Sequence, residues 1–296
     1  MRNKESFTVE IAGGLGNQLF MFYAGLFFQK HFKKEVTFDV SDLSRIEALH
    51  PGANIQTLGL LDDFRTINRP HFPSQIVERT ISGFKQITKK NFQKEFFVSK
   101  EIGYSDPNLI SPSVTRIRGY FQSWIYFHSL QDKPVLSLAS LQNPSKWLID
   151  KLETAKRERV LSLHIRRGDY ALPANRTSGI LSRQYFEKAI EQCSAYDSIW
   201  VFTDSPKVVE KEFADLNSSF KIVTPPSDSD PVESMLLMSA AHQIVISNST
   251  FSWWSAMLAP DSTVVTAPSK WFELREDPFR LIPDSWLRAS SDWVKQ

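Results

Sequence analysis

The 296-residue chain has few of the features that mark several protein classes. Its one cysteine, Cys193, excludes an internal disulfide and a cysteine-based zinc site, which is typical of a reducing compartment. With 35 basic and 33 acidic side chains the net charge is +2, which leaves no positive surplus for binding nucleic acid. The most apolar stretch, residues 19–28, is too short to cross a bilayer. We expect a cytoplasmic protein, with peripheral contact at the inner face of the membrane left open.

The order of predicted elements indicates an α/β fold. A strand at 7–11, a glycine-rich turn, an apolar helix at 18–32 and a strand at 35–39 form a β-α-β opening. The second half repeats this order, with strands at 160–165, 198–202 and 220–223 that alternate with helices at 182–193 and 206–213. Residues 137–145 have the Ser, Asn and Pro content of a hinge. We therefore predict two doubly wound domains, 1–145 and 146–296, with the last segment as a candidate to pack back on the first.

The most informative feature is the end of the strand at 160–165. His164 lies in the strand, and Arg166, Arg167 and Asp169 follow it directly. Ligands of open α/β sheets bind at the carboxyl ends of the strands, and an arginine fork matches a phosphate. A solvated turn with a surface ion pair is the competing interpretation. A third, cell adhesion through Arg167-Gly168-Asp169, is disfavoured because that tripeptide works on an exposed loop tip and here follows an apolar strand.

Two further strand ends carry polar groups. Asp204 follows the strand at 198–202, where its carboxylate could accept hydrogen bonds from guanine N1 and N2 or could cap the helix that begins at Pro206. Ser249 and Thr250 precede an apolar helix whose free amides would hold a diphosphate. The alternative for this segment is ordinary capping, with Trp253 and Trp254 packed as core; burial of at least one of the two is expected.

The glycine turn near the start begins like a dinucleotide-binding loop. Leu19 occupies the place of its third glycine, so a nicotinamide cofactor is disfavoured. Gly14 and Gly16 would let the backbone approach a ligand, while Asn17 and Gln18 offer amide groups near the helix start. A plain strand-to-helix turn remains the alternative.

Two weaker patterns concern metals and membranes. Asp228-Ser229-Asp230 resembles a manganese-binding carboxylate pair, but it lies in a proline-flanked polar loop, and we predict no metal. The stretch 84–100 mixes lysines with phenylalanines. It is typical either of contact with an anionic membrane or, more often, of a helix or ribbon with one solvated face.

Five motifs occur in the order typical of one enzyme family. They are Gly13-Gly14-Leu15-Gly16-Asn17-Gln18-Leu19-Phe20, Gly119-Tyr120-Phe121-Gln122-Ser123-Trp124, His164-Ile165-Arg166-Arg167-Gly168-Asp169-Tyr170, Phe202-Thr203-Asp204 and Ser247-Asn248-Ser249-Thr250-Phe251-Ser252-Trp253-Trp254. The ordered set resembles the inverting, GDP-fucose-dependent α-1,2-fucosyltransferases of bacterial type. Ser255 and Met257 depart from the glycine and tryptophan common at these places in that family, which bears on local pocket shape.

The resemblance implies a GT-B architecture, with two Rossmann-like domains facing across a cleft. It places GDP-fucose on the C-terminal domain and the acceptor mainly on the N-terminal one. It makes Arg166 the β-phosphate ligand and Asp204 the guanine or ribose contact. The expected mechanism adds Asn17 and Gln18 to Arg166 as catalytic residues, which help to position the acceptor. The residues expected to bind the donor are Gly14, Gly16, His164, Arg167, Asp169, Asp204, Asn248, Ser249, Thr250 and Phe251.

The expected reaction is metal-independent and inverting, and it uses no cofactor. L-fucose passes from GDP-β-L-fucose to the 2-hydroxyl of a terminal galactose in an oligosaccharide or lipid-linked glycan, such as an O-antigen. No general base can be identified from the sequence. The alternatives are a glycosyltransferase of the same fold with another nucleotide sugar, and a non-catalytic protein that binds a GDP-sugar or a glycan.

Overall fold

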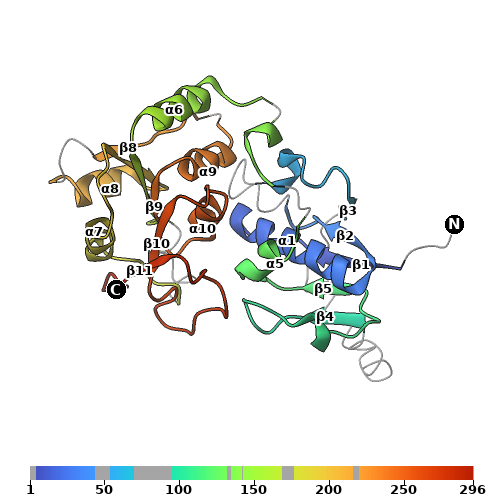
Figure 1. The fold of residues 1–296 in the computed structure, drawn as a ribbon. Helices are drawn as coiled ribbons and strands as arrows, with labels where there is room; N and C mark the ends of the chain where they lie inside the picture. Colours follow the sequence, from blue (N-terminus) through green and yellow to red (C-terminus); the bar gives the residue numbers. More distant parts are fainter. Residues whose placement is uncertain are drawn as a thin grey trace. The chain divides into compact units, whose positions relative to one another are not determined.

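The structure, a computed structural model, describes residues 5–43, 54–69, 95–131, 135–141, 143–168, 177–215, 220–227 and 229–295. The chain divides into two compact units. Unit 1 is Met1–Pro134 with Pro278–Leu281, and unit 2 is Val135–Asp277 with Ile282–Gln296. Each unit contains one β-sheet (Figure 1).

The sheet of unit 1 is parallel, with the described strands in the order β3-β2-β1-β5-β4. The strands are β1 (Ser6–Glu10), β2 (Glu35–Asp39), β3 (Arg65–Ile67), β4 (Phe96–Val98) and β5 (Arg116–Arg118). The helices among the described residues of this unit are α1 (Leu15–Phe32) and α5 (Trp124–His128), with short 3-10 helices at Ile55–Leu58 and Pro107–Leu109. Pro278–Leu281 packs here, since the carbonyl of Arg280 accepts hydrogen bonds from the Ser123 hydroxyl (2.9 Å) and the Trp124 amide (3.1 Å).

Helix α1 is apolar on nearly every face, which predicts burial rather than an amphipathic surface helix. Its aromatic side chains form edge contacts with neighbouring elements, as Tyr23 does with Phe127 and Phe28 with Phe121. Gly25 lies against the ring of Phe38 on β2, so close that a Cβ at this position would be 2.6 Å from the ring. The helix ends at Lys33, whose left-handed φ of 55° stops the repeat.

The sheet of unit 2 is also parallel, in the order β11-β10-β9-β6-β7-β8. Its strands are β6 (Val160–Ile165), β7 (Ser198–Thr203), β8 (Phe220–Ile222), β9 (Gln243–Val245), β10 (Val264–Pro268) and β11 (Leu287–Ala289). Its helices are α6 (Lys146–Arg157), α7 (Arg183–Glu191), α8 (Pro206–Glu212), α9 (Pro231–Ser239) and α10 (Thr250–Met257), with a 3-10 helix at Leu138–Ser140. Every residue of β6 is buried, as expected for a central parallel strand.

The predicted α/β class is confirmed. Strands at 35–39 and 160–165 coincide with β2 and β6, and the helix ends differ from the predicted ones by a few residues. Unit 2 begins before the predicted boundary at 145/146. The physical reason is that Ser145 caps α6 and also donates to Glu233 of α9, at 2.7 Å from its amide and 2.6 Å from its hydroxyl.

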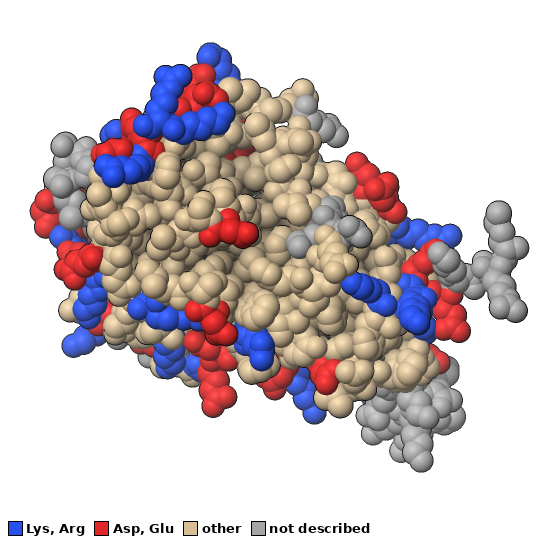
Figure 2. All heavy atoms as spheres, viewed as in Figure 1, with Lys and Arg blue, Asp and Glu red and all other residues tan. Residues whose placement is uncertain are grey.

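The charged surface shows no single-sign patch over α6. There Lys146 pairs with Asp150 and Lys156 with Glu153, and Figure 2 shows the two signs next to one another. In the described part of the chain, no helix combines the length and apolar character needed to span a bilayer. Of the lysine and phenylalanine stretch, Phe96 and Phe97 lie in β4, while residues 84–94 lie outside the described residues.

Candidate active site

The order of the strands in unit 2 locates a ligand crevice. The chain proceeds from β6 to β7 and β8 on one side, then crosses to β9 on the other side of β6. In open α/β sheets, ligands bind outside the carboxyl ends of the strands where the order reverses. That point lies between β6 and β9, and the segments that follow these strands begin with Arg166 and with Ile246-Ser247.

Arg166 and Asp204 meet because of the strand register. Ile165 of β6 pairs with Thr203 of β7, so the next residues of the two strands lie side by side. Arg166 Nε is 3.0 Å from Asp204 Oδ2, and the two side chains are 24% and 23% exposed. Asp204 Oδ1 accepts from the backbone amides of Arg167 (2.9 Å) and Gly168 (3.1 Å), and Oδ2 also accepts from the Gly168 amide (3.1 Å).

Arg167, by contrast, is directed into unit 2. Its side chain is 8% exposed and makes a two-bond pair with Glu212 of α8, at 2.9 Å from Nε and 2.8 Å from Nη2. Its guanidinium also lies over the ring of Phe186. This geometry gives Arg167 a structural role that joins the segment after β6 to α8, so its prediction as a donor ligand has no geometric support.

His164 is buried at the end of β6. Its Nδ1 is 2.7 Å from the hydroxyl of Ser247, which follows β9, and its ring is 5.9 Å from that of Phe251. Burial, and then the nearby charge of Arg166, lower the pKa of His164 to about 3. The imidazole is therefore neutral at physiological pH and serves as a hydrogen-bonding group at the crevice rather than as a cation.

The segment after β9 provides the start of α10. Ser249 is the N-cap residue, but its side chain makes no capping hydrogen bond, and Thr250 and Phe251 are half-buried in the first turn. The Asn248 amide donates to the carbonyls of Ser178 (2.9 Å) and Gly179 (3.2 Å), so its side chain anchors another segment of unit 2.

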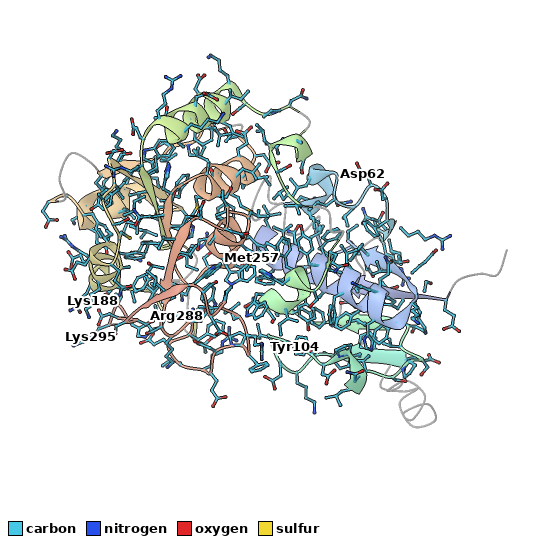
Figure 3. All side chains as sticks on the ribbon, viewed as in Figure 1. Asp62, Tyr104, Lys188, Met257, Arg288 and Lys295 are labelled. Atoms are coloured by element: carbon cyan, nitrogen blue, oxygen red, sulfur yellow. The ribbon has the colours of Figure 1, made fainter. Side chains whose placement is uncertain are left out.

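The apolar side of α10 packs as core. Trp253 and Trp254 are both buried, as predicted for at least one of them. At the two positions that depart from the resembled family, Ser255 is buried and Met257, labelled in Figure 3, is half-buried at the end of the helix.

The glycine turn of unit 1 begins α1. Gly14 is the N-cap residue and Gly16 is buried in the first turn. Gln18 is buried. Its side-chain Nε2 donates to the Gly13 carbonyl (2.8 Å) and its Oε1 accepts from the backbone amide of Ile55 (2.8 Å), so this side chain holds the segment together. Asn17 is half-buried and accepts from Gln122 at 2.9 Å. Contact of Asn17 and Gln18 with an acceptor stays a prediction, and the geometry of Gln18 gives it no support.

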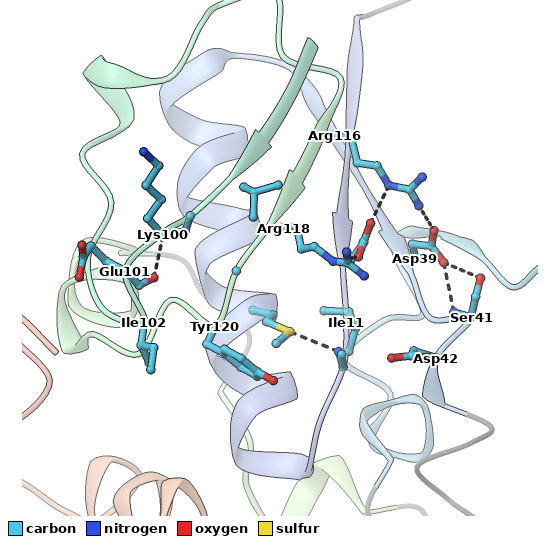
Figure 4. Close-up of a pocket in the computed structure, with 16 residues that line it drawn as sticks. Ile11, Asp39, Ser41, Asp42, Lys100, Glu101, Ile102, Arg116, Arg118 and Tyr120 are labelled. Atoms are coloured by element: carbon cyan, nitrogen blue, oxygen red, sulfur yellow. Dashed lines mark hydrogen bonds and ion pairs between the residues drawn. The ribbon is translucent and has the colours of Figure 1, made fainter. Parts of the chain in front are cut away.

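A pocket of about 600 Å³ lies at the carboxyl edge of the unit 1 sheet. Glu10 and Asp39 are register partners at the ends of β1 and β2. Arg116 of β5 pairs with both carboxylates, and Asp39 also accepts from the Ser41 hydroxyl (Figure 4). Arg118 Nε lies 2.6 Å from the other oxygen of Glu10.

This pocket has no excess of positive charge. Its two arginines contact carboxylates, and its lining also includes Lys100 together with Asp42 and Glu101, so it lacks the cationic surplus that a diphosphate requires. Its remaining lining includes the exposed ring of Tyr120 and the side chains of Met21 and Ile102. Hydrogen-bonding groups of both signs beside an aromatic face suit a neutral polyhydroxylated ligand such as a sugar.

Sequence reasoning missed four functional candidates: Ser247, Glu10, Asp39 and Arg116. Only the strand register could reveal them, because their partners are distant in sequence.

Asp230 of the suspected metal pair caps α9, since its carboxylate accepts a hydrogen bond from the Val232 amide (2.9 Å). Asp169 and Asp228 lie outside the described residues, and those that are described contain no group of three or more His, Cys, Asp or Glu side chains arranged to hold a metal.

Two parallel α/β sheets in successive halves of a chain, with an arginine at the switch point of the second, agree with the predicted GT-B class of fold. The chain belongs to glycosyl transferase family 11, whose model matches residues 1–280. The family predicted from the ordered motifs is thereby confirmed.

Two curated relatives from one species match this chain at low identity over nearly their whole length. The chain is 28% identical to an α-1,2-colitosyltransferase of Escherichia coli, over 95% of this chain and 98% of that one. It is 27% identical to the O-antigen biosynthesis glycosyltransferase WbnK of the same species, over 94% and 98%. A galactoside 2-α-L-fucosyltransferase, SEC1 of Bos taurus, is 25% identical over 60% of this chain and 50% of its own.

Solved structures with a similar chain path are more distant. A mutant of Arabidopsis thaliana FUT1, in complex with GDP, is 12% identical with a TM-score of 0.47, over 97% of this chain and 73% of that one. Fucosyltransferase NodZ from Bradyrhizobium is 12% identical with a TM-score of 0.46, over 87% and 94%.

Proposed function

We propose that this glycosyltransferase transfers L-fucose from GDP-β-L-fucose to the 2-hydroxyl of a terminal galactose, with inversion and without a metal. The observation that carries the proposal is the position of Arg166 at the carboxyl end of β6, beside the switch point and in contact with Asp204. Two of the curated relatives are described as α-1,2 or 2-α transferases, which supports the linkage.

The chemistry of this reaction suits a fixed guanidinium. As GDP leaves the anomeric carbon, negative charge grows on the β-phosphate and positive charge grows on the sugar ring. A preorganised Arg166 stabilises the former without reorganisation at the moment of reaction. The galactose hydroxyl attacks from the opposite face, so a β-linked donor gives an α-linked product. A dissociative transition state needs proton removal only late, to phosphate or to water.

The pocket of unit 1 supports acceptor binding there. Its carboxylates and guanidiniums pair with one another, and Tyr120 adds an aromatic face, a combination suited to the hydroxyl groups and C–H faces of a neutral sugar.

We expect Glu10→Gln to raise the KM for the acceptor galactoside with little change in the KM for the donor. Equal effects on both constants would contradict this placement.

Replacement of Arg166 tests the central residue. We expect Arg166→Ala to lower kcat about a hundredfold or more, because an electrostatic contact made at the developing charge is lost. Initial rates with GDP-fucose and a β-galactoside would measure this loss, and thermal unfolding would verify the fold. Turnover near that of the unchanged protein would remove Arg166 from the mechanism.

A second donor is favoured by one relative. Colitose is L-fucose without its 3-hydroxyl, and an α-1,2-colitosyltransferase matches 95% of this chain. Parallel rate measurements with GDP-fucose and GDP-colitose on the same β-galactoside panel would separate the two donors. A higher kcat/KM for GDP-colitose would reassign the donor and leave the linkage and fold unchanged.

Binding and chelation measurements address the remaining alternatives. In isothermal titration we expect tighter binding of GDP than of UDP, and equal binding would favour another nucleotide sugar.

Turnover should persist in EDTA, and its loss would overturn the metal-independent mechanism. GDP binding without transfer to any galactoside would identify a non-catalytic protein.

A further inference from the structure

The Asp204 carboxylate is engaged by three groups of its own unit, the amides of Arg167 and Gly168 and the Arg166 guanidinium. A carboxylate offers about four lone-pair sites on its two oxygens. Oδ1 faces the amides of Arg167 (2.9 Å) and Gly168 (3.1 Å), and Oδ2 faces the Gly168 amide (3.1 Å) and Arg166 Nε (3.0 Å). To accept two further hydrogen bonds from guanine, Asp204 would have to release at least one of these contacts.

The contacts that Asp204 makes with described residues converge on the segment after β6. It binds the backbone of the two residues that follow Arg166 and, at the same time, the side chain of Arg166 itself. Gly168 makes this close approach feasible, because a Cβ at this position would lie 2.7 Å from Asp204 Oδ2. The ion pair favours the side-chain conformations of Arg166 that keep its guanidinium beside this carboxylate.

We propose that Asp204 is a positioning residue, which holds the Arg166 guanidinium at the carboxyl edge of the sheet, and that Gly168 is required for this contact. The inference rests on the proposed function and assigns Asp204 a role other than the guanine or ribose contact expected from the sequence. It predicts that Asp204 contributes to turnover only through Arg166, and not to recognition of the base.

A double-mutant cycle separates these roles. Asp204→Asn keeps an acceptor oxygen for the amides but removes the charge that orients Arg166. We expect a loss of about tenfold or more in kcat with a small change in donor KM, and no more than about a twofold further loss when the same change is made in Arg166→Ala. A full loss in both backgrounds, or none in either, would overturn the proposal.

Base recognition provides the second readout. Inosine diphosphate lacks the 2-amino group of guanine, so the ratio of the GDP and IDP dissociation constants reports contacts to that group. We expect Asp204→Asn to leave this ratio unchanged within about twofold. A fall of this ratio toward one in Asp204→Asn would show that Asp204 contacts guanine, which is the role expected from the sequence.

Controls keep the proposal testable. Asp215→Asn is the matched control. This exposed carboxylate pairs with Arg183 on the surface, so its substitution should leave kcat unchanged.

If Asp204→Asn does not fold, Gly168→Ala displaces the carboxylate without removing it and enters the same cycle with Arg166→Ala. If the unchanged protein transfers neither fucose nor colitose, the proposed function fails, and the cycle is then followed by GDP affinity. An Asp204 effect on GDP affinity that persists in Arg166→Ala would contradict the positioning role independently.

Discussion

At the scale of single residues, burial decides which charged forms the site contains. His164 is 4% exposed and contacts the Ser247 hydroxyl, while the positive charge of Arg166 lies nearby. Protonation would place a second cation next to the first in a medium that solvates neither well. The crevice therefore combines the permanent positive charge of Arg166 with a neutral imidazole.

The low pKa of His164 predicts loss of stability in acid. The folded pKa of about 3 lies below the ordinary histidine pKa of 6.5, so below pH 6.5 the unfolded chain binds a proton that the folded protein does not. Stability from this residue is complete above that pH and is lost as pH falls toward the folded pKa, by about 1.4 kcal/mol per pH unit at most.

Urea unfolding at pH 7 and pH 5 would measure this dependence. We expect His164→Gln, which retains a group able to hydrogen-bond Ser247, to show a smaller drop in unfolding free energy than the unchanged protein. An identical drop in both proteins would assign the acid sensitivity to other groups.

At the scale of elements, α1 is held against the sheet of unit 1 by close approach as well as by apolar area. Gly25 permits the ring of Phe38 to touch the helix backbone, and a Cβ there would also lie 3.4 Å from Val36. In unit 2, Glu212 ties the segment after β6 to α8 through Arg167. The contact of Gly25 with Phe38 sets how near α1 lies to its sheet. The pair of Arg167 with Glu212 supports the segment that carries Arg166.

Substitution at Gly25 tests the helix contact. We expect Gly25→Ala to lower the free energy of unfolding by about 1 to 2 kcal/mol, because overpacking against Phe38 exceeds the gain in helix propensity. Denaturant unfolding would measure the change. Gly14→Ala is the control, since a Cβ at Gly14 meets no atom within 4 Å and its φ of −64° suits alanine. Equal losses in the two variants would refute the packing argument.

At the scale of the whole molecule, each unit has its own sheet and core, and unit 2 contains the proposed donor site. Of the eight tryptophans only Trp124 lies in unit 1, which leaves seven in unit 2. Tryptophan fluorescence therefore reports mainly on unit 2, whereas far-ultraviolet circular dichroism reports on both units.

Nucleotide should stabilise the transition seen by tryptophan fluorescence. At a GDP concentration of about 100 times its Kd, we expect about 2.7 kcal/mol of added stability, because ligand binds only the folded form. UDP at the same concentration serves as the comparison and should add less. A GDP effect visible by circular dichroism but absent from fluorescence would locate the nucleotide on unit 1.

The class of fold and the family follow from the amino-acid order alone. Apolar runs that end in glycine or charge predict strands of a parallel sheet, and the order of five motifs indicates one family, since both are properties of the chain read in one dimension. The sequence also located the carboxyl end of β6, because a buried strand that ends in two arginines is legible without coordinates.

Only the tertiary structure decided which of those side chains face a ligand and which hold the site together. Arg166 and Arg167 are indistinguishable in the sequence, yet the register of β6 with β7 places Asp204 beside the first, and the position of α8 brings Glu212 to the second. Gln18 and Asn248 likewise bind backbone groups distant in sequence. Hydrogen bonds depend on distance in space, and strand pairing and helix packing, rather than separation along the chain, set that distance.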